Sequence, residues 1–275
     1  MSLAAEVSGE IISSDSRHVY RRMDIGTNKP TPADQALVPH HLIDIREPET
    51  GFSLGEYVRL ARAAMNDVLS RQKVPLLVGG TGQYVRALLE GWQVPEVAPQ
   101  PDIRARWLAL AAERGAGALQ AELVARDPAA LLSIDPRNVR RVIRALEVME
   151  VTGQLWSELQ RSQPLERAKV QIITVNLPRE ELYQRADARL LRMIAQGWPE
   201  EVRRLLAELA AHNIGAEEAL RLPSMSALGY REMVALVRGQ ATLDETIATI
   251  KRETRRFIRA QDTWFRKITG AFSTG

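Results

Sequence analysis

Short apolar runs alternate with helical patterns along the first part of the chain. An apolar run at residues 9–14 is followed by a loop, by HHLIDI at 40–45 and by helical spacing at 53–72. VPLLV at 74–78 then leads through a glycine-rich turn into a helix. A buried strand followed by a glycine turn and a helix is typical of a βα unit in a parallel sheet. The pattern therefore predicts an α/β core with a parallel sheet.

The pattern changes near Trp92. A proline-marked linker, VPEVAPQPD, precedes three helical patterns, IRARWLALAAERG, ALQAELVARD and RNVRRVIRALEVMEV. KVQIITVNL at 169–177 has the pattern of a strand, and helices are predicted at 179–196, 199–212, 226–238 and 242–268. We therefore predict a helical insertion domain at 93–165 within an α/β core formed by 1–92 and 166–275.

The composition excludes several kinds of chemistry. The chain has 275 residues and no cysteine, so disulfides, thiolate nucleophiles and cysteine-bound zinc are excluded. No apolar run approaches the length of a membrane span. The lack of cysteine fits a reducing cytosol, and we expect a cytoplasmic monomer that does not bind membranes.

Arginine is clustered on two helical patterns, although the net charge is only +3. The helix predicted at 137–148 has one apolar face, and Arg137, Arg140, Arg141 and Arg144 occupy the remainder. Residues 251–267 carry seven positive charges against two negative, beside a predicted buried stripe. The stripe consists of Leu243, Ile247, Ile250, Phe257, Trp264, Phe265 and Ile268. A solvated face is the usual role of a charge run, but two such helices, one with Trp264, favour a nucleic-acid backbone.

Two features at predicted strand ends each have two interpretations. Asp15 is flanked by serines at the end of the first strand, which suits a general base or a metal ligand. The local sequence alone favours a helix or turn cap for Asp15. GGTGQY at 79–84 suits close approach to phosphate or to a base edge, or else forms only a tight βα turn.

The remaining candidates are cationic side chains. Arg185 and Arg189 form one i,i+4 pair that suits a phosphate clamp, with surface ion pairs as the alternative. His40 and His41 are neighbours in a predicted strand and point to opposite faces, so both can hardly bind one metal. We expect structural roles for these histidines.

Taken in order, these stretches resemble the bacterial tRNA dimethylallyltransferases, also called tRNA isopentenyltransferases. The resemblance rests on ISSDSRHVYRRMDIGTNKPT, VPHHLIDI, LLVGGTGQYVRALLEG, RVIRALEV, RADARLLRM, LPSMSALGYRE and RAQDTWFRK. It implies a P-loop nucleoside-kinase-like α/β fold with a parallel sheet and a helical insertion domain. It also implies transfer of a dimethylallyl group from dimethylallyl pyrophosphate to the exocyclic amine of an adenosine beside the tRNA anticodon.

The resemblance assigns roles to individual residues. Asp15 looks like the general base, Thr81 like a contact to the same adenine, and Arg189 like a pyrophosphate ligand that acts with Mg²⁺. The expected contacts to the tRNA anticodon stem-loop are Asp15, Ser16, Arg17, His18, Arg104, Arg140, Arg141, Val142, Ile143, Arg144, Arg259, Gln261, Trp264 and Arg266.

One family motif has no counterpart in this sequence. The family begins with a strand, a G-x-x-x-x-G-K-[ST] loop and a helix, and the loop grips the pyrophosphate. No glycine of this chain is followed by lysine. The chain thus resembles the family without its first strand and P-loop, and we expect transfer to be impaired.

Two alternatives remain open at this point. A tRNA-binding module without catalysis is favoured by the absent motif, whereas retention of Asp15 and Thr81 argues against it. An adenylate isopentenyltransferase would act on free nucleotide. The helical insertion and the basic last helix argue for tRNA, because a mononucleotide requires neither.

Overall fold

The computed structural model describes residues 1–93, 95–159, 165, 170–173, 175 and 177–272, with side chains described as far as residue 266. The chain divides into two compact units. The first contains Met1–Ser53, Tyr57–Leu89 and Leu165–Gly275, and the second contains Leu54–Glu56 and Glu90–Pro164. Each unit has a hydrophobic cluster of its own.

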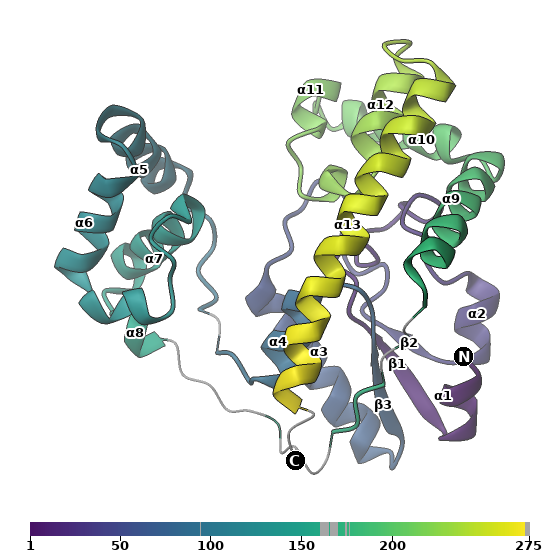
Figure 1. The fold of residues 1–275 in the computed structure, drawn as a ribbon, viewed down its shortest axis with the longest axis horizontal. Helices are drawn as coiled ribbons and strands as arrows, with labels where there is room; N and C mark the ends of the chain where they lie inside the picture. Colours follow the sequence, from purple (N-terminus) through teal and green to yellow (C-terminus); the bar gives the residue numbers. More distant parts are fainter. Residues whose placement is uncertain (94, 160–164, 166–169, 174, 176, 273–275) are drawn as a thin grey trace. The chain divides into compact units, whose positions relative to one another are not determined.

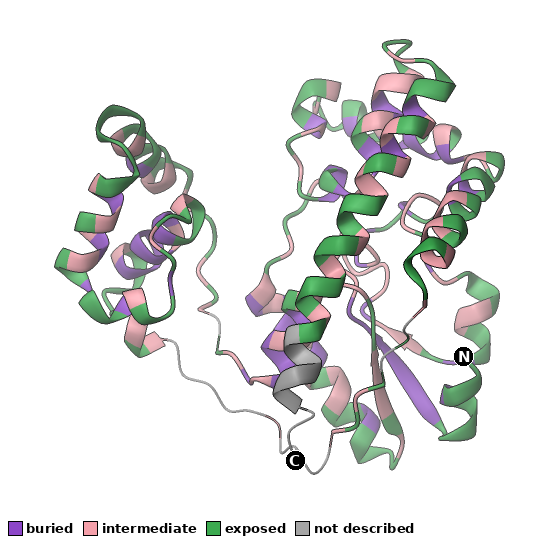
Figure 2. Ribbon diagram, viewed as in Figure 1, coloured by how far each residue is buried: buried purple, intermediate pink, exposed green. Residues whose placement is uncertain are grey.

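The first unit is built on a small parallel sheet. Its strands are β1 (Gly9–Ser13), β2 (His40–His41) and β3 (Val74–Val78), in the order β2-β1-β3. Both pairings are parallel, with Ile11 opposite His40 on one side and opposite Leu76 on the other. All of β1 is buried, as Figure 2 shows. The predicted α/β core with a parallel sheet is therefore confirmed.

The third strand differs from its prediction. The apolar run Val74–Val78 was expected to be buried, yet Val74 is 42% and Val78 52% exposed. The physical reason is its position, because β3 forms the edge of the described sheet and pairs with β1 alone.

A further strand was expected at 169–177. Residues 169, 174 and 176 lie outside the described part, and the described residues between 170 and 177 form no strand. Ile173 is 61% and Val175 83% exposed. At the described positions of this stretch the apolar sequence is not paired as a strand, and strand formation depends on a hydrogen-bonded neighbour as well as on sequence.

Nine α-helices lie wholly or, for α3, mostly in the first unit within the described part of the chain. They are α1 (Ser2–Glu6), α2 (Pro32–Leu37), α3 (Leu54–Ser70), α4 (Gly82–Leu89), α9 (Arg179–Ala195), α10 (Trp198–Ala211), α11 (Ala216–Ala219), α12 (Tyr230–Val237) and α13 (Leu243–Phe272). The last helix, α13, contacts α12, α9 and α4 along its length (Figure 1). The main hydrophobic cluster contains Tyr20, Met23, Trp198, Tyr230 and Ile250.

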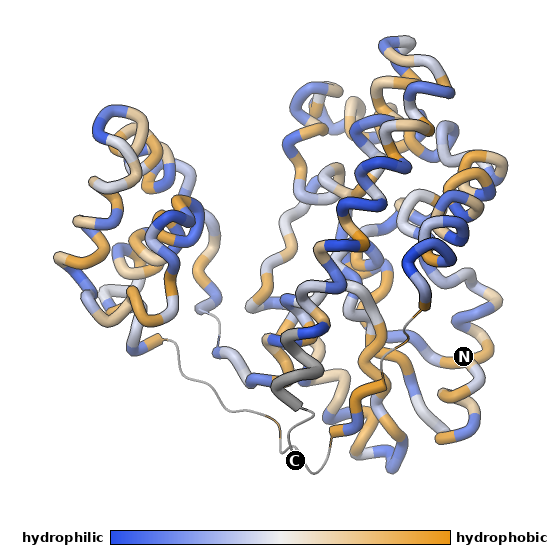
Figure 3. Tube along the Cα trace, viewed as in Figure 1, coloured by the Kyte–Doolittle hydropathy of each residue, from blue (hydrophilic) through white to orange (hydrophobic). Residues whose placement is uncertain are grey.

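Among the described side chains, the predicted buried stripe of α13 holds only for Ile247 and Ile250, since Leu243 at the start of the helix is 44% exposed. Ile250 is buried and Ile247 packs against the main cluster. Phe257 is 50% and Trp264 40% exposed, and the side chain of Ile268 lies outside the described residues. Most of α13 is exposed or intermediate, and hydrophilic residues recur along it (Figures 2 and 3). The helix leaves the core after its first turns, so the later aromatic side chains reach solvent.

The second unit is helical. It contains α5 (Pro101–Arg114), α6 (Ala116–Arg126), a 3-10 helix η1 (Pro128–Leu132), α7 (Val139–Thr152) and α8 (Trp156–Leu159). Asn138 caps α7 by accepting a hydrogen bond from the Arg141 amide. Arg137, which was expected in this helix, precedes it and pairs with Asp135. The cap thus fixes the start of α7 after Arg137.

Candidate active site

Backbone and side-chain hydrogen bonds join the carboxyl ends of β1 and β3. The Ser14 amide donates to the Val78 carbonyl over 2.7 Å, which continues the ladder past the end of β1. The Thr81 amide donates to the Ser14 carbonyl, and the Ser16 amide donates to the Thr81 hydroxyl, each over 3.0 Å. Asp15 therefore lies between two residues that are both bonded to Thr81.

Gly79 permits this close approach. A Cβ atom at this position would lie 2.3 to 2.7 Å from backbone atoms of Ser14, a distance that real Cβ atoms do not reach. The first glycine of GGTG is thus required by packing. Of the two interpretations of GGTGQY, the tight βα turn explains Gly79. The same turn also brings Thr81 to the end of β1.

The Asp15 carboxylate is partly exposed and partly held. Its Oδ1 accepts the Arg17 amide over 2.8 Å, and its Oδ2 lies 3.9 Å from Nε2 of His18. The bond to the amide two residues ahead is a turn-type bond, as the local sequence indicated. That bond occupies one oxygen, and with 32% of the side chain exposed the carboxylate also faces solvent.

His18 is fixed on both sides of its ring. Nδ1 lies 3.3 Å from the Ser13 hydroxyl and Nε2 lies 3.2 Å from the Thr27 carbonyl. Because a carbonyl only accepts, Nε2 carries a hydrogen in this contact, and in a neutral ring Nδ1 then accepts from the Ser13 hydroxyl. This tautomer directs the Nε2–H edge toward both Thr27 and Asp15.

The last helix reaches the glycine turn. Gln261 Nε2 donates to the Gly80 carbonyl over 2.9 Å. Trp264 packs against Gly82, where a Cβ would lie 3.1 Å from the Trp264 Cβ. Two of the expected tRNA contacts from α13 are thereby placed beside Thr81.

Arg189 of α9 lies within electrostatic range of Asp15. The residue is exposed, but protein atoms around its guanidinium lower its pKa by desolvation, Arg192 lowers it further, and Asp15 opposes both. The structure gives Arg189 no hydrogen bond or ion pair among the described residues, whereas Arg185 pairs with Glu181 over 2.6 Å. The sequence left two interpretations for Arg185 and Arg189, a phosphate clamp or surface ion pairs. Arg185 forms a surface ion pair, so of these two residues Arg189 is the one that remains available to an anion.

Tyr84, the last residue of GGTGQY, is buried beside the turn. Its ring stacks on Tyr57 with centroids 3.8 Å apart. Burial raises the pKa of both hydroxyls well above the usual range, and Asp15 adds to the shift at Tyr84. Both phenols therefore stay neutral. The sequence placed Tyr84 after the glycine turn, but nothing in it named Tyr57 as its partner.

Other expected contacts of the first unit already have partners. Arg17 donates to the Pro223 carbonyl over 2.5 Å, and Arg259 donates to the Tyr183 hydroxyl over 3.3 Å. Arg266 pairs with Asp262 over 2.7 Å. These arginines keep further N–H groups that can donate to phosphate.

In the second unit, two expected tRNA contacts share one buried carboxylate. Arg104 binds Glu147 through Nε at 2.7 Å and Nη2 at 2.9 Å, and Arg144 binds it over 2.6 Å. Glu147 is fully buried, and sequence reasoning did not identify it. Arg140 and Arg141 are exposed at the start of α7.

The side chains of Val142 and Ile143, two further expected tRNA contacts, are buried. Val142 is fully buried and Ile143 is 5% exposed, and both belong to the hydrophobic cluster of the second unit. Their side chains pack against the other helices because they form the apolar face of α7. In the structure these two side chains pack in the core of the second unit, and the positive charge at the start of α7 comes from the exposed Arg140 and Arg141.

The histidines of β2 have structural partners. His40 Nδ1 lies 2.7 Å from the Val38 carbonyl, and His41 Nε2 lies 2.8 Å from the Glu10 carboxylate. Within the described ranges, no three His, Asp or Glu side chains are grouped so as to hold a metal ion. The described residues therefore offer Mg²⁺ no cluster of three such ligands.

The comparison with protein families decides the identity. The model of the family described as IPP transferase matches residues 18–268. The chain belongs to the IPP transferase family.

Individual IPP transferases are similar over nearly the whole chain. The tRNA dimethylallyltransferase of Roseiflexus sp. (strain RS-1) is 54% identical over 266 residues, which cover 97% of this chain and 84% of that protein. The tRNA dimethylallyltransferase of Chloroflexus aurantiacus (strain ATCC 29366 / DSM 635 / J-10-fl) is 52% identical over 96% of this chain and 86% of that protein. The predicted family is therefore confirmed.

Solved structures of this family share the fold. A full-length tRNA isopentenylpyrophosphate transferase from Bacillus halodurans is 36% identical with a TM-score of 0.64, over 96% of this chain and 80% of that one. A eukaryotic dimethylallyltransferase acting on tRNA is 25% identical with a TM-score of 0.71, over 95% of this chain and 64% of that one. No helix in the described part of this chain is long and apolar enough to span a membrane.

Proposed function

We propose that the chain transfers a dimethylallyl group from dimethylallyl pyrophosphate to the exocyclic amine of the adenosine beside a tRNA anticodon. The observation that carries the proposal is the joining of Asp15 and Thr81 at the ends of β1 and β3 in a member of the IPP transferase family.

The setting of Asp15 supports its proposed role as the general base. An adenine amine is a poor nucleophile, so a nearby carboxylate must take its proton as the new C–N bond forms. Oδ1 is held by the Arg17 amide, which fixes the carboxylate plane. Oδ2 then accepts the proton, and the electron pair of the cleaved C–O bond leaves with the pyrophosphate.

Thr81 suits recognition of the same base. Its Oγ1 accepts from the Ser16 amide, so its own hydroxyl hydrogen is available to a ring nitrogen of adenine. The hydrogen-bonded turn holds this hydroxyl beside Asp15. The target base must leave its stack to reach both groups, which costs a few kcal/mol.

Arg189 suits the leaving group. Its guanidinium lies within electrostatic range of Asp15 and of a second cation, Arg192. Negative charge grows on the pyrophosphate as the C–O bond breaks, and a fixed cation stabilises that charge. We place the pyrophosphate against Arg189, with the dimethylallyl carbon directed toward Asp15.

The tRNA backbone is proposed to lie along the arginine-rich helices. Arg259 and Arg266 extend from α13, while Arg104, Arg140, Arg141 and Arg144 belong to the second unit. Contacts to phosphate supply the free energy that offsets base extrusion. Gln261 and Trp264 lie at the glycine turn, where the extruded base would arrive.

The proposal for Mg²⁺ is limited. The ion keeps most of its waters and binds proteins through few carboxylates together with substrate phosphates. Since the described residues contain no metal cluster, we expect it only as the counter-ion of the pyrophosphate and derive no step through it.

We further propose that a polypeptide of these 275 residues alone transfers slowly. Its sequence contains no G-x-x-x-x-G-K-[ST] loop, and such a loop supplies backbone amides and a lysine to phosphates. The test is a transfer assay with unmodified tRNA that reads codons beginning with U, dimethylallyl pyrophosphate and Mg²⁺. The RNA is digested and its nucleosides are analysed by mass spectrometry. A version with a strand, loop and helix of this type joined upstream is the reference.

Each outcome of this assay is distinct. Dimethylallyl adenosine formed only by the extended version supports both proposals, and equal rates would show that the loop is dispensable. If neither version transfers while both bind tRNA, the chain is a tRNA-binding module. Modification of free adenylate in place of tRNA would identify an adenylate isopentenyltransferase.

A further inference from the structure

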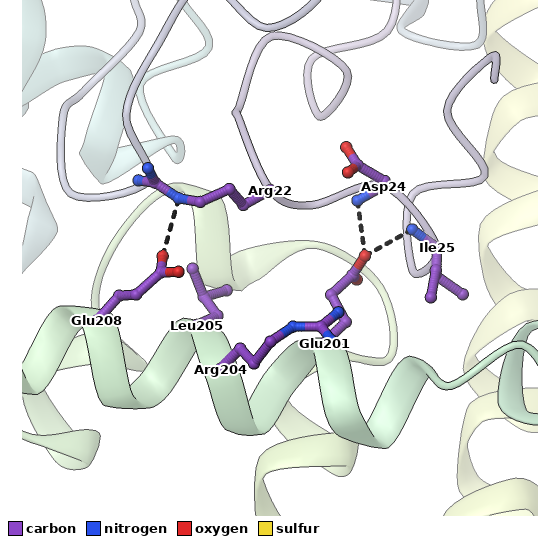
Figure 4. Close-up of a pocket in the computed structure, with 7 residues that line it drawn as sticks. All are labelled: Arg22, Asp24, Ile25, Glu201, Arg204, Leu205 and Glu208. Atoms are coloured by element: carbon purple, nitrogen blue, oxygen red, sulfur yellow. Dashed lines mark hydrogen bonds and ion pairs between the residues drawn. The ribbon is translucent and has the colours of Figure 1, made fainter. Parts of the chain in front are cut away.

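A buried carboxylate on α10 holds the loop that follows the Asp15 segment. Glu201 is 4% exposed, and its Oε2 accepts the amides of Asp24 and Ile25 over 2.8 and 2.6 Å. Oε1 accepts the Gly26 amide over 3.1 Å and the Tyr230 hydroxyl over 2.7 Å. Figure 4 shows Glu201 reaching from its helix to Asp24 and Ile25. A buried carboxylate that receives four donors is strongly bound.

Packing fixes the same loop against the same helix. A Cβ on Gly26 would lie 2.1 Å from the indole nitrogen of Trp198, so only glycine fits. Trp198 and Glu201 are three residues apart on α10 and share one face. The helix therefore presents one apolar and one charged group to three consecutive residues of the loop.

A buried ammonium anchors the loop at its other end. Lys29 is 8% exposed, and its Nζ donates to the Tyr20 carbonyl over 2.7 Å and to the Asp24 and Asp44 carboxylates over 2.6 Å each. The loop is thus held by opposite charges at its two ends. It cannot shift without leaving one buried charge unpaired, which is energetically costly.

The loop that Glu201 and Lys29 hold contacts His18, which in turn lies beside Asp15, the candidate general base. Thr27 follows Gly26, and its carbonyl lies 3.2 Å from His18 Nε2. The same Nε2 lies 3.9 Å from Asp15. The position of the Thr27 carbonyl therefore decides which ring nitrogen of His18 carries the hydrogen and which edge faces Asp15.

We propose that Glu201 is a positioning residue: by fixing residues 24–27 it holds the Thr27 carbonyl against His18 and so sets the tautomer beside Asp15. The significance of this arrangement for dimethylallyl transfer rests on the proposed function. Glu201 itself touches neither substrate nor Asp15. Its effect passes through the loop and the imidazole.

The chain offers a matched control on the same helix. Glu208 also lies on α10, and both Glu201 and Glu208 line a cavity of about 190 Å³ (Figure 4). The Glu208 carboxylate pairs with the Arg22 side chain over 2.8 Å, and its side chain is 47% exposed. Glu201→Gln and Glu208→Gln make the same chemical change. Only the first removes an acceptor of backbone amides.

The test uses NMR on the 275-residue chain, whose four histidines permit assignment of His18 with a His18→Gln variant. In the unchanged chain we expect the Nε2–H tautomer of His18 and slow exchange of the Asp24, Ile25 and Gly26 amides. In Glu201→Gln these amides should exchange at least about tenfold faster, and the His18 nitrogen shifts should move toward a mixture of tautomers. Glu208→Gln should change neither.

Two results would overturn the proposal. One is an Nδ1–H tautomer in the unchanged chain, a measurement that does not depend on whether any variant folds. The other is faster amide exchange in Glu201→Gln with unchanged His18 signals, which would leave Glu201 a structural role alone. Binding of an unmodified anticodon stem-loop RNA is measured on the same samples. Lack of binding by the unchanged chain would contradict the proposed function, and the tautomer result would stand independently.

Discussion

The amide of Ser16 donates to the hydroxyl of Thr81 over 3.0 Å, although the two residues are 65 positions apart in the sequence. The bond joins the segment after β1 to the turn after β3. It places the candidate base and the candidate adenine contact at the same edge of the sheet, where ligands of parallel sheets bind.

Replacing Thr81 by valine should test this connection. The change keeps the shape of the side chain but leaves the Ser16 amide without its acceptor. We expect the free energy of unfolding to fall by about 1 kcal/mol and transfer by the extended version to fall at least about tenfold. Urea unfolding and the nucleoside assay measure the two effects. Thr50→Val is the control, since that exposed hydroxyl donates only to the Glu47 carbonyl. Similar losses in both variants would contradict a specific role for Thr81.

Gly79→Ala should destabilise the first unit. The new methyl group would overlap the Ser14 backbone at 2.3 to 2.7 Å, and neither backbone segment can move without breaking the bonds at Thr81. We expect a loss of at least about 2 kcal/mol in thermal or urea unfolding. Gly51→Ala serves as the control because nothing lies within 4 Å of its added Cβ. A stability equal to that of the Gly51 variant would show that the two segments separate easily.

The stability of the sheet should depend on pH through Glu10. This carboxylate in β1 is 2% exposed and binds Arg71, Lys73 and His41. The hydrogen bonds of Arg71 dominate and hold the pKa of Glu10 far below its ordinary value of 4.5, against the opposing effect of burial. A lowered pKa in the folded state stabilises the protein fully above the unfolded value, and the contribution is lost as pH falls toward the folded value.

Glu10→Gln should therefore lower the free energy of unfolding at pH 7 by about 2 kcal/mol. The difference from the unchanged chain should shrink as the pH is lowered below 4.5, the ordinary value. Urea unfolding at several pH values measures this dependence. Glu217→Gln removes an exposed pair with Arg238 and should have little effect. A difference that stays constant from pH 7 to pH 3 would contradict the assignment.

Arg259→Gln should weaken RNA binding in a salt-dependent manner. The Arg259 guanidinium donates to the Tyr183 hydroxyl and has further N–H groups for phosphate. We expect the slope of log affinity against log salt concentration to decrease by about one unit. Fluorescence anisotropy with an anticodon stem-loop measures the slope. Arg203→Gln on α10, whose side chain pairs with Glu200, is the charge-matched control. An unchanged slope would remove Arg259 from the proposed RNA surface.

The sequence predicted the elements better than their exposure. Helical periodicity located α5, α6, α7, α9 and α10 closely, because their apolar faces are local patterns. The local sequence could not predict that Phe257 and Val78 are exposed, because the burial of a side chain depends on whether another element of the fold packs against it. The same holds for the apolar pattern at 170–173, where the described residues form no strand.

The candidate site was predictable only in part. Asp15 and Thr81 stand at strand ends, where a parallel sheet places functional residues, and the motifs marked them. Glu147 and Glu201 were not identified, because a lone glutamate on a helix gives no sequence signal of its burial. Among their partners, Arg104 for Glu147 and Asp24 for Glu201 lie 43 and 177 positions away, and only the fold brings them together.

The most direct test of the central claim is the rate of dimethylallyl transfer by the extended version with Asp15→Asn. Asparagine keeps the size of the side chain but cannot take the amine proton. We expect the transfer rate to fall by a factor of about 10² to 10⁴, while binding of the stem-loop is retained. Asp67→Asn, which changes an exposed carboxylate paired with Arg71, is the control and should transfer at the normal rate. An unchanged rate in Asp15→Asn would contradict the assignment of Asp15 as the general base and with it the proposed active site.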